Sequence, residues 1–190
     1  VYVENPNYNF TGNAVEAGLD VSSTDRAASS GFESSRTGFQ LGTNFEQYEN
    51  FYIAPKITSA IEDIEVDASA SSAIKKMEGN YFNVDFGYSL SVDKRNQTFK
   101  PTKGYITTFN QQLPIIQDSS SIVNGISISA YEDFSEDLIG SFKVFAKSVN
   151  GVDDDVRLTN RLYIPPSRLR GFNTYSVGPK DGKDYIGGNY

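Results

Sequence analysis

The feature of this sequence that most restricts its fold is a strict alternation of apolar residues with polar or small ones. From Phe82 to Val92 every even position is apolar, and the odd positions between them are Asn, Asp, Gly, Ser and Ser. Because successive side chains of a β-strand point to opposite faces, this pattern predicts a strand with one apolar and one polar face. The same pattern, in places weaker, recurs in residues 14–21, 36–45, 51–61, 104–113, 122–130 and 138–148. The sequence therefore predicts about seven long strands.

The composition agrees with two-faced strands and excludes several classes of function. The 190 residues include 13 Phe and 12 Tyr, yet the mean hydropathy is −0.42. There is no Cys and no His, so a Ser–His or Cys–His catalytic triad, a thiolate or imidazole zinc site and a disulfide are all excluded. The net charge of −7 argues against nucleic acid as a partner. We expect neither an enzyme nor a bound cofactor.

The connections between the predicted strands alternate in length. Short connections are predicted near residues 6–12, 46–50 and 132–137, a moderately long turn at 93–103, and long loops at 22–35, 63–79 and 150–184. Short turns at one rim and long loops at the other are typical of an all-β, antiparallel up-and-down transmembrane barrel, whose long loops lie outside the cell. The sequence has no run of 18 apolar residues, which excludes a transmembrane helix but not such a barrel.

A soluble β-sandwich is the alternative fold, since its strands alternate in the same way. Two observations favour the barrel. Aromatic residues stand near the ends of the apolar faces, as in Phe39 with Phe45 and Phe82 with Tyr88, a distribution typical of the girdles at a membrane interface. The opposite faces carry Gly, Ser, Asn, Asp and Lys, which suits a water-filled lumen.

The segment after the last long predicted strand contains three short motifs in a fixed order. Arg170-Gly171-Phe172 comes first, Gly178-Pro179 follows, and Gly187-Gly188-Asn189 comes last. In order and spacing they resemble the sixth extracellular loop of the BamA (bacterial surface antigen) superfamily of outer-membrane protein assembly factors. In that loop an Arg-Gly-Phe tripeptide precedes a Gly-Pro element and a strand that starts with paired glycines. Residues 3–8 and 101–104 also resemble barrel segments of that family.

The resemblance implies that residues 1–190 form one partial barrel domain, with about seven to eight strands of a barrel of about sixteen. It places the long extracellular loop at about 150–184. It also leaves the closing strands and the periplasmic POTRA domains outside this sequence, so we expect a fragment cut at both ends.

The resemblance further implies that the long loop folds back into the lumen. The predicted loop motif comprises Arg168, Arg170, Gly171, Phe172, Gly178 and Pro179, and the predicted strand start comprises Gly187 and Gly188. Arg170 offers a permanently charged fork of five donors, Gly171 permits a sharp turn, and Phe172 adds an apolar anchor. The polar strand faces contribute three lumen-facing acids, Glu16, Asp20 and Asp85. The resemblance nevertheless places the main acidic partner of Arg170 on a closing strand outside this sequence.

The function that the resemblance implies is the folding and insertion of β-barrel proteins into the bacterial outer membrane, without a cofactor or a metal. The partners would be nascent outer-membrane β-barrel proteins, accessory assembly lipoproteins and outer-membrane lipid. Two-partner secretion transporters and TamA-like translocation barrels share the loop motif and remain an alternative, as do a passive porin and a soluble lectin. Asp153-Asp154-Asp155 could hold a divalent ion, but a solvated acidic loop tip is the preferred interpretation.

Overall fold

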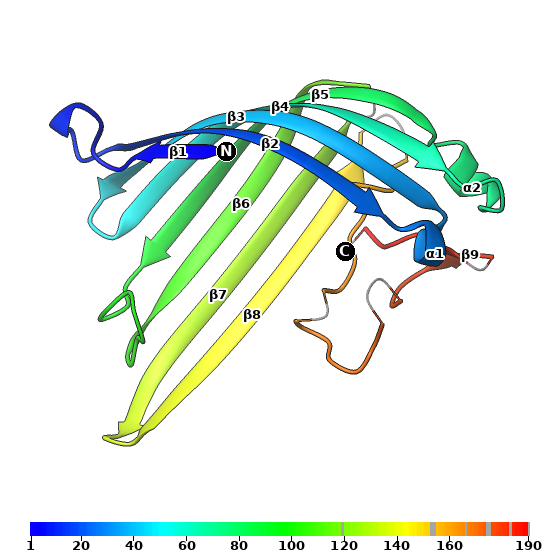
Figure 1. Ribbon diagram of the computed structural model, residues 1–190. Coiled ribbons are helices and arrows are strands. Elements are labelled where there is room, and N and C mark those ends of the chain that lie inside the picture. The colour runs from blue at the N-terminus through cyan, green and yellow to red at the C-terminus, as the bar shows by residue number, and fades with distance from the viewer. Residues whose placement is uncertain (119, 153–154, 166, 174–175, 183, 190) are drawn as a thin grey trace.

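The computed structural model consists of one eight-stranded antiparallel sheet, followed by a long and mostly irregular segment that carries the two-stranded sheet of β9 (Lys180–Asp181) and β10 (Asp184–Tyr185) (Figure 1). It describes residues 1–118, 120–152, 155–165, 167–173, 176–182 and 184–189. The eight strands of the sheet are β1 (Tyr2–Asn5), β2 (Ala14–Asp25), β3 (Phe32–Tyr48), β4 (Phe51–Val66), β5 (Gly79–Asp93), β6 (Gly104–Gln117), β7 (Ser121–Ser135) and β8 (Leu138–Gly151). Each pairs with its neighbours in chain order, as the up-and-down prediction required, and β1 and β8 are the two edges.

The remaining elements are short and lie between the strands or after them. They are η1 (Tyr8–Phe10), α1 (Ala27–Ser30), α2 (Ser72–Lys75), β9 (Lys180–Asp181) and β10 (Asp184–Tyr185). Among the described residues, no helix has the length and hydrophobicity needed to span a membrane.

The seven long strands that the sequence predicted are all present, but several are longer than predicted. The predicted long loop at 22–35 shrinks to residues 26–31, and the one at 63–79 shrinks to 67–78. The extra strand residues pair through their backbones, as Ser22 does with Arg36 and Asp25 with Glu33. In residues 22–25 and 33–35 every position is polar, so the alternation that marks a strand in the sequence is missing there although the backbone pairing continues. Residues 63–66 do alternate, with Ile64 buried, and their assignment to a loop was wrong.

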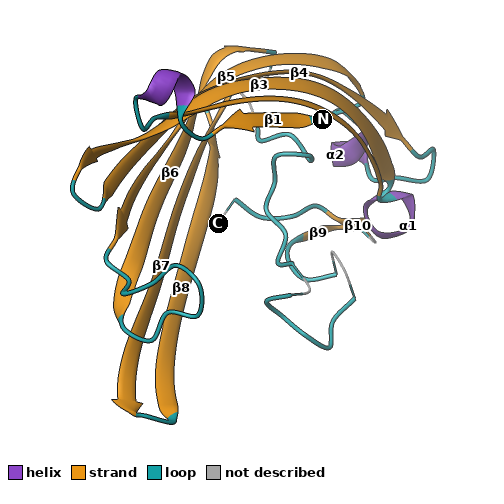
Figure 2. Cartoon of the chain, turned by 60° about the vertical axis from the view of Figure 1, so that its left-hand side comes forward, coloured by secondary structure: helices purple, strands orange, loops and turns teal. Residues whose placement is uncertain are grey.

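The sheet bends into an arch, and the chain after β8 lies on its concave side (Figure 2). Apolar residues of successive strands stand in register on one face, as Leu41, Ile57 and Phe86 do across β3, β4 and β5. Large apolar side chains exposed on this face include Leu19, Phe39, Leu41, Ile57, Ile61, Phe82, Ile126 and Val144. An apolar surface that crosses this many strands needs a covering partner or a lipid environment, which agrees with the predicted membrane barrel.

Glycines on the polar face leave room for the acids of the neighbouring strand. Gly38 pairs with Asp20, and Gly42 pairs with Glu16. A Cβ atom at Gly38 would lie 2.6 Å from an Asp20 carboxylate oxygen, and one at Gly42 would lie 2.7 Å from a Glu16 carboxylate oxygen. The long acidic side chains therefore lie across the neighbouring glycines, and any larger residue at Gly38 or Gly42 would displace them.

We predict that the two faces differ in their tolerance of charge. Ile57 lies on the exposed apolar face, whereas the adjacent Thr58 pairs with Asp85 on the polar face. Ile57→Lys should destabilise the folded protein in lipid vesicles by about 2–4 kcal/mol, because it exposes an ammonium group to hydrocarbon. The control Thr58→Lys introduces the same charge beside a carboxylate and should be tolerated. Equal denaturant midpoints for the two variants would contradict the assignment of faces.

Candidate functional site

The candidate site is the segment after β8, which returns beneath the arch and docks on the polar face of the sheet (Figure 2). We define its docked part, residues 155–163 and 184–189, as the loop root, and residues 164–182 as the loop tip. The two halves of the root meet at Leu162 and Gly188, whose amides donate to each other's carbonyls at 2.8 and 2.9 Å. The Tyr163 hydroxyl donates to the Tyr185 carbonyl at 3.2 Å. The tip therefore begins and ends near the hydrogen-bonded pair of Leu162 and Gly188, which we call the base of the tip.

One side of the root is apolar and completes a hydrophobic cluster at the loop end of the sheet. Leu158 is 1% exposed and packs with buried residues of β3, β4 and the β4–β5 connection. The buried members are Phe32, Ile64, Ala70, Ile74 and Leu158, and Ile186 of the root packs against them. Burial of a leucine side chain contributes about 2 kcal/mol, so this contact alone favours the docked position.

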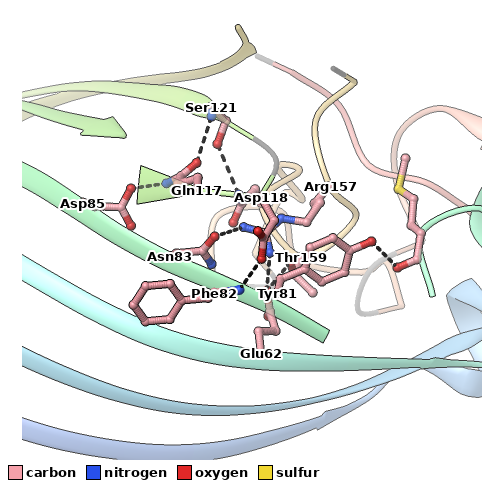
Figure 3. Close-up of polar contacts among 12 residues, drawn as sticks. Glu62, Tyr81, Phe82, Asn83, Asp85, Gln117, Asp118, Ser121, Arg157 and Thr159 are labelled. Atoms are coloured by element: carbon pink, nitrogen blue, oxygen red, sulfur yellow. Dashed lines mark hydrogen bonds and ion pairs between the residues drawn. The ribbon is translucent and has the colours of Figure 1, made fainter. Parts of the chain in front are cut away.

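Next to Leu158, Arg157 enters the polar face of the sheet (Figure 3). Its side chain is buried, with the residue 2% exposed. One terminal nitrogen donates to the Asn83 side-chain oxygen at 2.7 Å, and the other lies 3.6 Å from a carboxylate oxygen of Glu62. The guanidinium carbon lies 4.5 Å from the centre of the Tyr81 ring. Thr159 donates to the same Glu62 carboxylate at 2.9 Å.

Burial disfavours the charged form of the Arg157 guanidinium, and its polar partners stabilise that form. Burial lowers the pKa of the Arg157 guanidinium, and the carboxylate of Glu62 acts in the opposite direction. Arginine is protonated in all ordinary conditions, so the buried group is a cation and requires its partners. Glu62 is itself 7% exposed. Arg157 and Glu62 are therefore a buried ion pair between the root and β4.

Further hydrogen bonds join the root to the start of β7 and the end of β6 (Figure 3). The Asn160 amide donates to the Ser121 hydroxyl at 3.2 Å, and the Ser121 backbone N–H donates to Gln117 at 3.0 Å. The Gln117 amide donates in turn to Asp85. The predicted lumen acid Asp85 is thus part of the support for the root.

The second half of the root is also fixed. Asp184 is buried and accepts a hydrogen bond from the Ser71 backbone N–H at 3.0 Å, at the start of α2. The Val149 N–H of β8 donates to the Asn189 carbonyl at 2.7 Å, so the chain after the glycine pair begins to pair with the edge strand β8. The strand start at Gly187 and Gly188 stays a prediction, because the structure assigns Gly188 an isolated bridge with Leu162 and no strand at 187–189.

Gly187 has a specific structural requirement for glycine. Its φ is +70°, in the left-handed region that other residues adopt at a cost. A Cβ atom there would lie 2.9 Å from the Tyr163 ring and 3.0 Å from the Cβ of Arg161. Gly187 thus permits the close approach of the two halves of the root.

The tip carries the predicted loop motif in an exposed position. Arg170 and Phe172 are exposed, Phe172 by 59%, and Gly171 turns the chain with a φ of +88°. Within the described residues, the Arg170 side chain forms no hydrogen bond or ion pair, and Glu16, Asp20 and Asp85 do not contact it. The anchoring role expected of Phe172 stays a prediction. Arg168, in contrast, stacks with its guanidinium carbon 3.7 Å from the centre of the Phe145 ring of β8.

A cavity of about 830 Å³ separates the tip from the inner face of β8. Its lining includes Arg26, Phe145, Lys147, Arg161, Tyr163 and Arg168, and on the tip side Gly178 and Pro179. Arg26 lies with its guanidinium carbon 4.6 Å from the centre of the Tyr163 ring. The cavity is therefore basic, although the chain as a whole is acidic.

Arg157, Glu62 and Leu158 were not predicted from the sequence, because no motif surrounds them and their contacts are distant in the sequence. Of the acidic run at 153–155, Asp153 and Asp154 lie outside the described residues. Asp155 pairs with Arg161 at 2.8 Å, which is a structural role. Within the described ranges, no group of three or more acidic side chains is arranged to hold a metal ion.

Comparison with known proteins gives a consistent result. The Omp85 superfamily domain matches residues 2–190. The Sorting and assembly machinery component 50 homolog of Bos taurus is 30% identical over 129 residues, which are 63% of this chain and 26% of that protein. Homolog B from Xenopus laevis is 27% identical over 124 residues, with the same coverage. Outer membrane protein assembly factor BamA of Neorickettsia risticii is 25% identical over 135 residues, 66% of this chain and 18% of that protein.

Among solved structures, BamA from Haemophilus ducreyi lacking POTRA domains 1–3 superposes with a TM-score of 0.86 at 16% sequence identity. The superposition covers 99% of this chain and 42% of that chain. The fold is thus that of part of the BamA barrel. The chain spans about a quarter or less of the length of the curated relatives it matches.

We predict that Gly187→Ala opens the base of the tip. The left-handed backbone costs a non-glycine residue about 1–2 kcal/mol, and the clash with Tyr163 adds to this cost. Gly182→Ala is the matched control, because its φ of +61° imposes the same strain with no atom within 4 Å of the new Cβ. Hydrogen exchange of the Leu162 and Gly188 amides should accelerate more in Gly187→Ala than in Gly182→Ala. Equal exchange in the two variants would contradict this role of Gly187.

Proposed function

The chain belongs to the Omp85 superfamily, and from this premise we propose that it is part of the barrel of an outer-membrane protein assembly factor. In this function the whole protein folds and inserts other β-barrel proteins into the outer membrane. The observation that carries the proposal is the docked loop: an Arg-Gly-Phe segment rises from a base fixed on the concave face of a BamA-like sheet.

The chemistry of the described residues supports a mechanical role. An added strand pairs with the edge of a sheet through backbone hydrogen bonds, which need no catalytic side chain. The contribution of this chain would be a wall with an apolar outer face, together with a loop that keeps the shape of the wall fixed. The partners that we propose are nascent outer-membrane β-barrel proteins, outer-membrane lipid and accessory assembly lipoproteins.

The proposed location is the bacterial outer membrane. The fold shared with BamA and the Omp85 superfamily domain both support it. The apolar face of the sheet supplies the lipid-contacting surface that this location requires.

Two-partner secretion and TamA-like barrels, which the sequence analysis kept as alternatives, differ from an assembly factor in their cargo. A passive porin is a different class, and the docked root disfavours it, because the segment occupies the concave side where a pore would run (Figure 2). Steady single-channel conductance of the full-length protein, without any effect of its loss on barrel assembly, would favour the porin.

Within this function we propose that Arg168, Arg170, Gly171, Phe172, Gly178 and Pro179 form the working part of the loop, with Gly187 and Gly188 starting the following strand. The exposed fork of Arg170 is available to a carboxylate outside these 190 residues. Phe172 is available in the same way as an apolar anchor.

We predict that Arg170→Ala in the full-length protein lowers the heat resistance of the folded barrel and impairs assembly of outer-membrane β-barrel proteins in cells. The expected loss of stability is about 1.5–3 kcal/mol, the net contribution of hydrogen bonds to a charged group. Lys180→Ala removes another exposed cation from the tip and is the control. Gel mobility after graded heating and the cellular level of folded β-barrel proteins measure the two effects. Wild-type behaviour of Arg170→Ala in both would remove Arg170 from the mechanism.

A further inference from the structure

We propose that Arg157 is a positioning residue, which fixes the loop root to two strands of the barrel wall and so sets where the Arg170 segment stands. This inference rests on the proposed function for its consequence in assembly. The role of Arg157 in fixing the root is inferred from its contacts with Asn83 and Glu62.

The guanidinium of Arg157 contacts two strands at once. One terminal nitrogen donates to Asn83 of β5 and the other lies near Glu62 of β4, while the guanidinium carbon lies over the ring of Tyr81. A planar fork can make these contacts together, whereas the point charge of a lysine cannot. Arg157 therefore determines the position of the root relative to both strands, beyond neutralising one acid.

The buried pair of Arg157 and Glu62 also favours the docked position of the root. Arg157 and Glu62 are both buried, and moving the root away would leave Glu62 without its cation and without the Thr159 hydrogen bond. Undocking would also take Leu158 out of its hydrophobic cluster. Replacing Arg157 by an uncharged residue would leave the Glu62 carboxylate buried without its cation for as long as the root stays docked, which is strongly unfavourable. The docked position of the root is thus favoured by the ion pair of Arg157 and by the apolar packing of Leu158.

Arg157 is connected to the tip by a short stretch of hydrogen-bonded chain. Arg157 accepts backbone hydrogen bonds from Asn160 and Arg161, and the next residue, Leu162, is paired with Gly188 at the base of the tip. A shift of Arg157 therefore moves the point from which the tip starts. Through this path a residue that does not contact Arg170 can position it.

The chain offers a matched control at Arg36. This arginine also lies on the polar face and faces a carboxylate, Asp20, but their closest approach is 3.9 Å and the side chains are 42% and 51% exposed. Such an exposed pair contributes little to stability. Arg36 stands opposite Glu62 in the β3–β4 ladder, but no contact joins it to the described residues of the root. Arg36→Met therefore removes a positive charge near Glu62 and leaves the contacts of the root in place.

The test is hydrogen–deuterium exchange of the full-length protein in detergent micelles, for wild type, Arg157→Met, Arg157→Lys and Arg36→Met. In Arg157→Met we expect the amides of Asn160, Arg161, Leu162 and Gly188 to exchange at least about tenfold faster, because the docked root opens locally. The β6–β7 ladder should stay within about twofold of wild type. Arg157→Lys keeps the charge, preserves folding, and should give an intermediate acceleration of the root. Arg36→Met should match wild type.

Three results would overturn the proposal: unchanged exchange of the root in Arg157→Met, wild-type rates in Arg157→Lys, or equal acceleration of the root and the β6–β7 ladder. The last result would reduce Arg157 to a general stabiliser of the barrel. Assembly of outer-membrane β-barrel proteins in cells should fall in Arg157→Met and recover in part in Arg157→Lys. If the wild-type protein supports no assembly, the proposed function is wrong, while the exchange rates still decide the role of Arg157.

Discussion

Backbone pairing between neighbouring strands is the constraint on which the rest of this structure depends. In the hydrocarbon of a membrane, each unpaired N–H or C=O group costs several kcal/mol, so a sheet can cross only if its strands are paired on both sides. Here β2 to β7 are paired on both sides, in chain order. Once the backbone is extended, successive side chains must face opposite ways. The apolar outer face and the polar inner face therefore follow from the pairing and from the alternation in the sequence.

The concave face is then the place where polar groups can be buried at low cost, because the wall itself supplies partners. The loop root makes use of this. Leu158 joins the hydrophobic cluster at the end of the sheet, and Arg157, one residue earlier, reaches Glu62 and Asn83 on the wall. Asp184 fixes the other half of the root through the Ser71 backbone N–H. Arg170 of the tip stays exposed, which leaves it available to groups outside these residues.

The sequence was sufficient to predict the long strands and their faces, because the face of a residue depends only on its position in an extended chain. It was insufficient at the loop ends of β2 and β3, where residues 22–25 and 33–35 pair although every one of them is polar. Arg157 could not be predicted, since Asn83 is 74 positions away and no local pattern links them. The motif predicted Gly187 as part of a strand start, which stays a prediction, and the structure gives this residue a separate role through its positive φ and the nearby Tyr163 ring. The acidic partner of Arg170 remains a prediction, because no described residue fills that role.

The most direct test of the central claim is a quenching scan along β8, whose residues 141–146 are exposed on both faces. Single cysteines at positions 141 to 146 are introduced into the full-length protein in lipid vesicles and labelled with a fluorophore, which is practical because these 190 residues contain no native cysteine. Because the two faces contact different media, a quencher carried on lipid chains should act on positions 142, 144 and 146. A water-soluble quencher should act on positions 141, 143 and 145. Quenching without a period of two, or equal access of the aqueous quencher to all six positions, would contradict the account.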